Sequence, residues 1–295
     1  MNEDSNNPLV SVVVITYNSA ATVIETLESI KDQSYGRLEL IITDDCSKDN
    51  TIEKCSSWLK ANAQRFVHSE LLTVPKNTGT SANVNRGIKK CKGEWIKQIA
   101  GDDRLLKSCI QDNVNFINKN PNSEIVISKV KFFGNPIVIE KYNKLFVYRN
   151  FKLPRRKFYK KLLMGNFIPA AASFISKNVY EEVGLYDESI PLMEDWPFWM
   201  KACRGGCSFR FNDVETVEYR VQESISISSN KSSKYVESEI AAHKLSLKYQ
   251  KELSLILWSY TVFKDYLRII LGRYLCCFFT IALLCYKETM VRFQF

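Results

Sequence analysis

The run from Leu9 to Thr16, LVSVVVIT, is nearly all apolar and mostly β-branched. Such a strand is typical of a parallel sheet, whose strands are buried on both faces. Further apolar runs of strand length follow, and segments with helical spacing separate them. The expected strands are Leu38–Thr43, Leu71–Val74 and Glu94–Ala100, and the expected helices are Ala20–Asp32, Asn50–Ala61 and Ser81–Lys90. This alternation predicts an α/β fold with a mostly parallel open sheet flanked by helices.

The pattern changes to α+β after Asn120 and Pro121. We expect strands near Glu124–Phe133, Ala171–Ser176, Ser208–Phe211 and Val214–Val221, with a basic connection after the first, and helices near Phe158–Leu163, Lys177–Val183 and Trp196–Arg204. Ser224 to Ser233 then forms a serine-rich linker, and Lys234–Lys251 has helical spacing. We therefore expect a main domain over residues 1–230, with halves 1–120 and 121–230, and a C-terminal helical tail over 231–295.

The net charge of +9 at pH 7 favours a polyanionic partner. Between Lys141 and Lys161 nine cations occur without a single carboxylate. Such a run is either a solvated loop or a patch that binds phosphate or a membrane, and the sequence leaves both open. No recognition motif accompanies the charge, so we expect no nucleic-acid partner.

The segment from Met1 to Pro8 is polar and acidic, and it lacks the basic start and apolar stretch of a secretory signal. The chain has nine cysteines, an odd and scattered set that favours reduced thiols over a disulfide framework. Both features predict a cytoplasmic protein.

Polar clusters follow the predicted strands, at the edge where open α/β sheets bind their ligands. The first is Thr16, Tyr17 and Asn18, whose ring and polar groups suit a nucleotide base. An ordinary strand end, with Asn18 capping the next helix, is the alternative. The second cluster begins with Asp44 and Asp45, and a carboxylate there can accept hydrogen bonds from a base or a ribose.

The third cluster, Asn77 to Gly79, leads into a helix whose free N–H groups could face phosphates. The fourth is Asp102 and Asp103, directly after the strand EWIKQIA. Two carboxylates at a strand end suit a hard divalent ion that keeps other coordination positions for substrate phosphates.

Together the four clusters resemble family 2 glycosyltransferases of the GT-A fold. The resemblance lies in VSVVVITYNSAATVIETLESI, LELIITDDCSKDNT, NTGTSANVNRGI and GEWIKQIAGDDRL, in the family's order and spacing. It implies a nucleotide-sugar donor and places Thr16 to Asn18, Asp45, Asn77 and Asp102 around the nucleotide. Asp102 and Asp103 then form the metal-binding motif for Mn²⁺ or Mg²⁺. Ala100 departs from the family, because many relatives have an aspartate there.

The segment NFIPAAASFISKNVYEEVGLYDESIPLMEDWPFWMK, Asn166 to Lys201, resembles the acceptor side of the same family. The resemblance makes Asp195 the catalytic base and Glu194 and Trp196 candidate acceptor contacts. Alternatively, Asp195 only caps the following helix. Arg220 is a candidate diphosphate contact or an ordinary paired surface arginine, and Gln222 stands where relatives often have a histidine.

The stretch from Leu253 to Tyr286 is apolar and rich in aromatic residues, but charged residues interrupt it, and its uninterrupted part, Tyr274 to Tyr286, is too short to span a bilayer. We expect peripheral contact with the inner face of the cell membrane through 253–286; packing on the main domain or a partner chain is the alternative.

The resulting hypothesis is an inverting hexosyl- or N-acetylhexosaminyltransferase that uses a UDP-linked donor. Its expected acceptor is a lipid-linked oligosaccharide of O-antigen or capsule type. The rival is a catalytically silent nucleotide-sugar-binding or scaffold subunit, and an oligomer is compatible with either.

Overall fold

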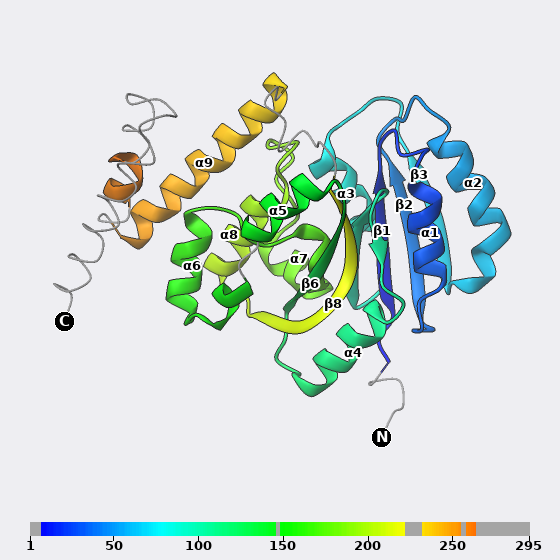
Figure 1. Ribbon diagram of the computed structural model, residues 1–295, viewed down its shortest axis with the longest axis horizontal. Coiled ribbons are helices and arrows are strands. Elements are labelled where there is room, and N and C mark those ends of the chain that lie inside the picture. The colour runs from blue at the N-terminus through cyan, green and yellow to red at the C-terminus, as the bar shows by residue number, and fades with distance from the viewer. Residues whose placement is uncertain (1–6, 146–147, 222–231, 255–257, 264–295) are drawn as a thin grey trace. The chain divides into compact units, whose positions relative to one another are not determined.

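The computed structural model describes residues 7–145, 148–221, 232–254 and 258–263. The chain divides into two compact units, Met1–His243 and Lys244–Phe295. The first unit contains an eight-stranded sheet in the order β3-β2-β1-β4-β7-β6-β8-β5 (Figure 1). Its strands are β1 (Val10–Thr16), β2 (Leu38–Asp44), β3 (His68–Thr73), β4 (Trp95–Ala100), β5 (Arg104–Leu105), β6 (Ile125–Gly134), β7 (Ser173–Ser176) and β8 (Phe209–Val221).

The N-terminal part of the sheet is parallel, as predicted. β1 pairs in parallel with both β2 and β4, and β2 pairs in parallel with β3. Helices α1 (Val23–Lys31) and α2 (Thr51–Asn62) pack against each other, and α3 (Thr80–Lys90) packs against β1 and β2. Gly87 permits this close approach, because a Cβ atom there would lie 2.5 Å from Cγ1 of Val13.

The remaining strands make the sheet mixed. β7 is antiparallel to β4 and to β6, whereas β8 runs parallel to β6 and antiparallel to β5. Lys97 of β4 is fully buried, and its ammonium group donates to the carbonyl oxygens of Ala171 and Ser173. Lys97 therefore links β4, at the centre of the sheet, to the start of β7.

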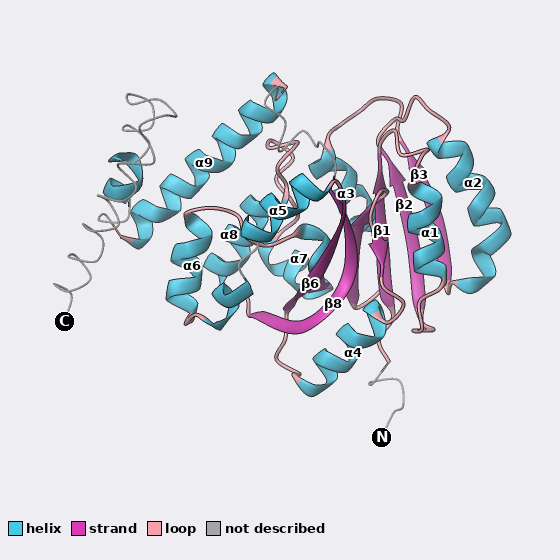
Figure 2. Cartoon of the chain, in the orientation of Figure 1, coloured by secondary structure: helices cyan, strands magenta, loops and turns pink. Residues whose placement is uncertain are grey.

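Several elements of the second half differ from the predictions (Figure 2). The two strands expected over Ser208–Phe211 and Val214–Val221 are one strand, β8, because two irregularities in its pairing with β6 accommodate Asp213, Val214 and Thr216. The helix α4 (Cys109–Lys119) was not predicted, and the expected basic connection contains a helix, α5 (Pro136–Leu145). The other helical segments are the 3₁₀ turns Tyr148–Lys152 and Ala170–Ala172 and the helices α6 (Arg155–Leu163), α7 (Lys177–Val183) and α8 (Asp195–Gly205).

The predicted tail begins with α9 (Ser233–Leu253), which confirms a helix at the start of this region. In the second unit, Lys251 places its ammonium group 5.6 Å from the ring centre of Trp258. None of the helices within the described ranges is both long and apolar enough to cross a bilayer. The predicted boundary at residue 230 and most of the expected membrane-contact segment, 255–257 and 264–286, lie outside the described residues.

Candidate active site

Hydrogen bonds join the loops that follow β1, β2 and β4 at the carboxyl edge of the sheet. The hydroxyl of Thr16 donates to the Asp44 carboxylate at 2.7 Å, and the backbone N–H of Asp45 donates to the carbonyl of Thr16 at 3.0 Å. The N–H of Gly101 donates to the carbonyl of Ile15 at 2.9 Å. Three of the predicted clusters therefore lie at one edge of the sheet.

Tyr17 and Asn18 form the surface of this edge. The Tyr17 side chain is 50% exposed, so its ring is accessible to a base. Asn18 has a φ of 51°, and its side-chain oxygen accepts a hydrogen bond from the N–H of Lys48 at 2.8 Å. Asn18 therefore stabilises the loop after β2. It does not cap the next helix, because Thr22 is the N-cap residue of α1. Asn77, in the loop after β3, is exposed.

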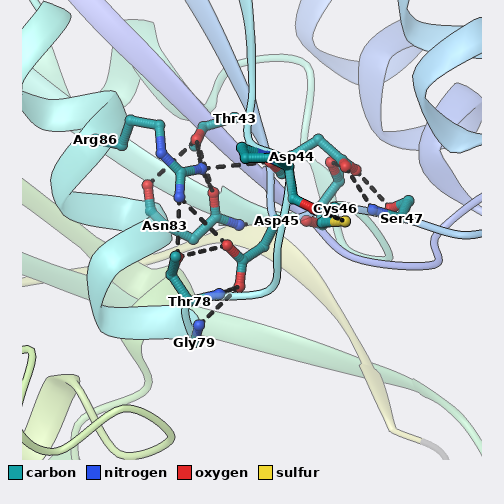
Figure 3. A network of polar contacts seen from close by, with 11 residues as sticks. Thr43, Asp44, Asp45, Cys46, Ser47, Thr78, Gly79, Asn83 and Arg86 are labelled. Carbon is teal, nitrogen blue, oxygen red and sulfur yellow. Dashed lines mark hydrogen bonds and ion pairs between the residues drawn. The ribbon is translucent and has the colours of Figure 1, made fainter.

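The carboxylate of Asp45 is buried and bound by donors from the start of α3 (Figure 3). It accepts hydrogen bonds from the N–H and hydroxyl of Thr78, at 2.9 and 2.6 Å, and from the N–H of Gly79, at 2.7 Å. The guanidinium of Arg86 lies 3.2 Å from the same carboxylate. Asp45 therefore links the loop after β2 to the loop after β3.

The two carboxylates after β4 have different surroundings. Asp102 is exposed, whereas Asp103 is buried and accepts a hydrogen bond from the N–H of Arg220 at 2.7 Å. Burial, together with the neighbouring charge of Asp102, raises the pKa of the Asp103 carboxyl well above its usual range, although Arg220 opposes this shift. The Arg220 side chain donates to the carbonyl of Asp102 and to Glu25, at 2.8 and 2.7 Å. Arg220 thus fixes the acidic pair against α1.

The donor set of this acidic pair fits a divalent cation only in part. Asp102 offers an exposed carboxylate, and Asp103 has one oxygen engaged by Arg220. Over the described ranges, the His, Cys, Asp and Glu side chains form no group of three that could hold a metal ion. Because Mg²⁺ is often held by one or two carboxylates plus substrate phosphates, these residues suit an ion that the donor helps to bind.

Asp195 is the first residue of α8, and Glu194 is the N-cap residue of this helix, so the expectation of a helix that begins at Trp196 with Asp195 as its cap is wrong. Its carboxylate accepts hydrogen bonds from the side-chain N–H of Asn166 and the backbone N–H of Trp196, both at 2.7 Å. Burial raises the pKa of Asp195 to about 6, and these two donors oppose the shift. Burial and the charge of Asp195 also raise the pKa of Glu194.

Tyr219 lies within range of the charges of both the acidic pair and Asp195. Burial is the main cause that raises the pKa of its phenol, and the charges of Asp103 and Asp195 add to the shift. Both carboxylates therefore act on one side chain, although 92 positions separate them in the sequence. Trp196 is buried, and its indole N–H donates to the carbonyl of Leu162 at 2.7 Å.

The structure adds four residues that the sequence analysis did not single out: Glu25, Arg86, Asn166 and Tyr219. Glu25, Arg86 and Asn166 lie inside segments that carry the family resemblance, so their presence could have been noted. Their contacts with Arg220, Asp45 and Asp195 depend on the tertiary fold, and no periodicity in the sequence indicates them.

Comparison with known proteins agrees with this geometry. Residues 11–184, more than half of the chain, match the model of the family "Glycosyl transferase family 2". An uncharacterized glycosyltransferase of Rickettsia felis is 28% identical over 67% of this chain and 32% of its own length. Another, of Rickettsia typhi, is 26% identical over 76% of this chain and 67% of its own length.

Solved structures show the same fold. S. aureus TarS 1–349 in complex with UDP has a TM-score of 0.60 at 19% identity, covering 90% of this chain and 71% of TarS. The mannosyltransferase PcManGT from Pyrobaculum calidifontis, in complex with GDP-Man and Mn²⁺, has a TM-score of 0.58 at 15% identity, covering 89% of this chain and 81% of its own. The polar edge of the parallel strands, the matching family model and the shared fold lead to one conclusion: this chain belongs to glycosyltransferase family 2 and has the GT-A fold.

Proposed function

We propose that this family 2 glycosyltransferase moves a hexosyl or N-acetylhexosaminyl group from a nucleotide-sugar donor to a hydroxyl group, with inversion at the anomeric carbon. The observation that carries the proposal is Asp195, a half-buried carboxylate oriented by Asn166 and by the N–H of Trp196. Its raised pKa makes it a stronger base than an ordinary aspartate.

In the proposed reaction Asp195 takes the proton of the acceptor hydroxyl. The acceptor oxygen forms a bond to the anomeric carbon, and the bond from that carbon to the diphosphate breaks. Attack from the side opposite the leaving group inverts the configuration, so an α-linked donor gives a β-linked product. The nucleoside diphosphate leaves with the bonding electrons, and Arg220 is a candidate contact for its charge.

The donor is proposed to bind at the edge formed by the loops after β1, β2 and β3. Tyr17 offers an exposed ring for the base, Asp45 a carboxylate for its N–H, and Asn77 an exposed amide. A UDP-linked donor is supported by the TarS complexes with UDP and UDP-GlcNAc, which share this fold.

A divalent metal, Mn²⁺ or Mg²⁺, is proposed to bind at Asp102 and Asp103 together with the donor diphosphate. When bound, it would stabilise the negative charge of the leaving group. The Mn²⁺ complex of PcManGT, a protein of the same fold, supports this assignment. The burial of Asp103 favours Asp102 as the more accessible ligand.

The proposed acceptor is a lipid-linked oligosaccharide of a cell-surface glycan such as O-antigen or capsule. The protein would then work in the cytoplasm, at the inner face of the cell membrane, and contact it through residues 253–286. The net charge of +9 and the apolar composition of that segment support this location.

Donor turnover with and without manganese tests the proposed activity against the rival hypothesis of a silent subunit. We would incubate the full chain with a panel of UDP- and GDP-sugars and cell-derived lipid extracts, and detect products by mass spectrometry. We expect release of nucleoside diphosphate with transfer to a lipid-linked glycan, and a lower rate in chelator. Nucleotide-sugar binding without hydrolysis or transfer under any of these conditions would support the silent subunit.

A further inference from the structure

The segment from Tyr148 to Leu163 carries an unusual concentration of charge. It has seven cations and no carboxylate: Arg149, Lys152, Arg155, Arg156, Lys157, Lys160 and Lys161. Within the described part of the chain, no ion pair neutralises any of them. Among the described residues, Arg155 alone of the seven donates a side-chain hydrogen bond, to the carbonyl of Cys203 at 3.3 Å.

Helix α6 carries its apolar residues and its cations on opposite sides. Phe158, Leu162 and Leu163 are buried, and the Phe158 ring packs against the rings of Phe167 and Phe209. The opposite side of the helix presents two pairs of cations, Arg156–Lys157 and Lys160–Lys161. Since like charges four residues apart destabilise a helix, this arrangement does not serve the stability of α6.

The last turn of α6 is fixed to the proposed catalytic base. The carbonyl of Leu162 accepts the indole N–H of Trp196, and Asn166 donates to Asp195, both at 2.7 Å. A surface bound by the cations of α6 would therefore be held at a fixed position relative to Asp195.

We propose that the basic face of α6, defined as Arg156, Lys157, Lys160 and Lys161, docks the main domain on an acidic phospholipid bilayer through the headgroup phosphates. The face lacks apolar side chains, which favours adsorption to the headgroups over insertion. It also lacks aromatic side chains for stacking on bases, which argues against single-stranded nucleic acid. The role of docking, to hold Asp195 near a membrane-bound acceptor, rests on the proposed function, whereas lipid binding itself needs no catalysis.

The size of the expected loss of membrane affinity follows from the electrostatic contribution of each cation. A basic residue near an acidic membrane contributes roughly fivefold in affinity, so neutralising four should weaken binding roughly 600-fold. The effect should be strongly reduced at about 1 M salt, where the Debye length falls to about 3 Å.

The experiment compares two variants of the full chain that lose the same charge. R156Q/K157Q/K160Q/K161Q removes the basic face, and K60Q/K92Q/K107Q/K119Q removes four exposed lysines elsewhere in the main domain. Binding is measured by co-sedimentation with vesicles of phosphatidylcholine containing about 30% phosphatidylglycerol, and with pure phosphatidylcholine vesicles. Thermal melting shows that each variant is folded, and neither donor nor acceptor is added.

We expect the native chain and the control variant to bind the acidic vesicles, and the α6 variant to bind them roughly 600-fold more weakly. Equal binding by the two variants would overturn the proposal, and so would native binding to the acidic vesicles that is no tighter than to pure phosphatidylcholine vesicles. Tighter binding to a DNA oligonucleotide than to acidic vesicles at equal phosphate concentration would also overturn it, in favour of nucleic acid. Because no turnover is measured, failure here is distinguishable from failure of the proposed enzymatic function.

Discussion

The hydrogen-bond partners of Asp45 limit how a base can bind at the proposed donor site. A carboxylate offers about four lone-pair positions, and Asp45 already receives four donors from Thr78, Gly79 and Arg86. A base N–H can bind there only by displacing one of them, and the longest contact is the one to Arg86, at 3.2 Å. Asp45 is thus proposed both to order the loop before α3 and to receive the base.

Asp45→Ala should weaken binding of UDP and of every UDP-sugar by a similar factor, because it removes a base contact. It should also lower the free energy of unfolding by roughly 3 kcal/mol, since Arg86 and two N–H groups lose a buried partner. Calorimetric titration and urea denaturation measure the two effects. The control, Arg86→Met, should lose stability but keep its affinity for UDP. Unchanged UDP affinity in Asp45→Ala would refute the base contact.

At the scale of elements, α3 joins the donor half of the domain to the segment before Asp195. Asn85 is buried, and its side chain bonds both the N–H and the carbonyl of Tyr186, at 3.0 and 2.9 Å. The hydroxyl of Ser81 donates to the carbonyl of Ile190 at 2.6 Å. The donor and acceptor sides are therefore held together by contacts between α3 and residues 186–191.

Gly79→Ala tests this junction. Gly79 has a φ of 95°, and a Cβ atom would lie 2.7 Å from the Cβ of Pro191. Backbone strain and overpacking should together destabilise the domain by roughly 2–4 kcal/mol, measured by urea denaturation. Gly36→Ala is the matched control, because nothing lies within 4 Å of its added methyl group, and it should change stability by less than about 0.5 kcal/mol. Equal stability of the two variants would show that Gly79 and Pro191 can move apart without a loss of stability.

At the scale of the whole molecule, the parallel half of the sheet was predictable because each strand is an apolar run and each crossover has helical spacing. The second half was less so. Helix α4 was missed because asparagines interrupt its apolar face, and Asn113 is itself buried there. Site residues after the strands could be named from the sequence, but the contacts of Asp45 with Arg86 and of Asp195 with Asn166 join segments far apart in the chain.

The most direct test of the central claim is the transfer rate of Asp195→Asn. The substitution keeps an oxygen for the N–H of Trp196 but cannot take the acceptor's proton. Losing general-base catalysis typically lowers the rate by roughly 10²–10⁴-fold, whereas losing a structural hydrogen bond at the start of α8 costs only about 1 kcal/mol of stability. Glu194→Gln, a change at the neighbouring carboxyl, serves as the control.

Transfer assays and calorimetric nucleotide titrations should be made on one preparation of each variant. The account predicts that Asp195→Asn folds and binds nucleotide like the native chain but transfers sugar at least about 100-fold more slowly, while Glu194→Gln loses much less. Near-normal transfer by Asp195→Asn, with only a small drop in melting temperature, would contradict the proposed mechanism and leave Asp195 as a structural residue at the start of α8.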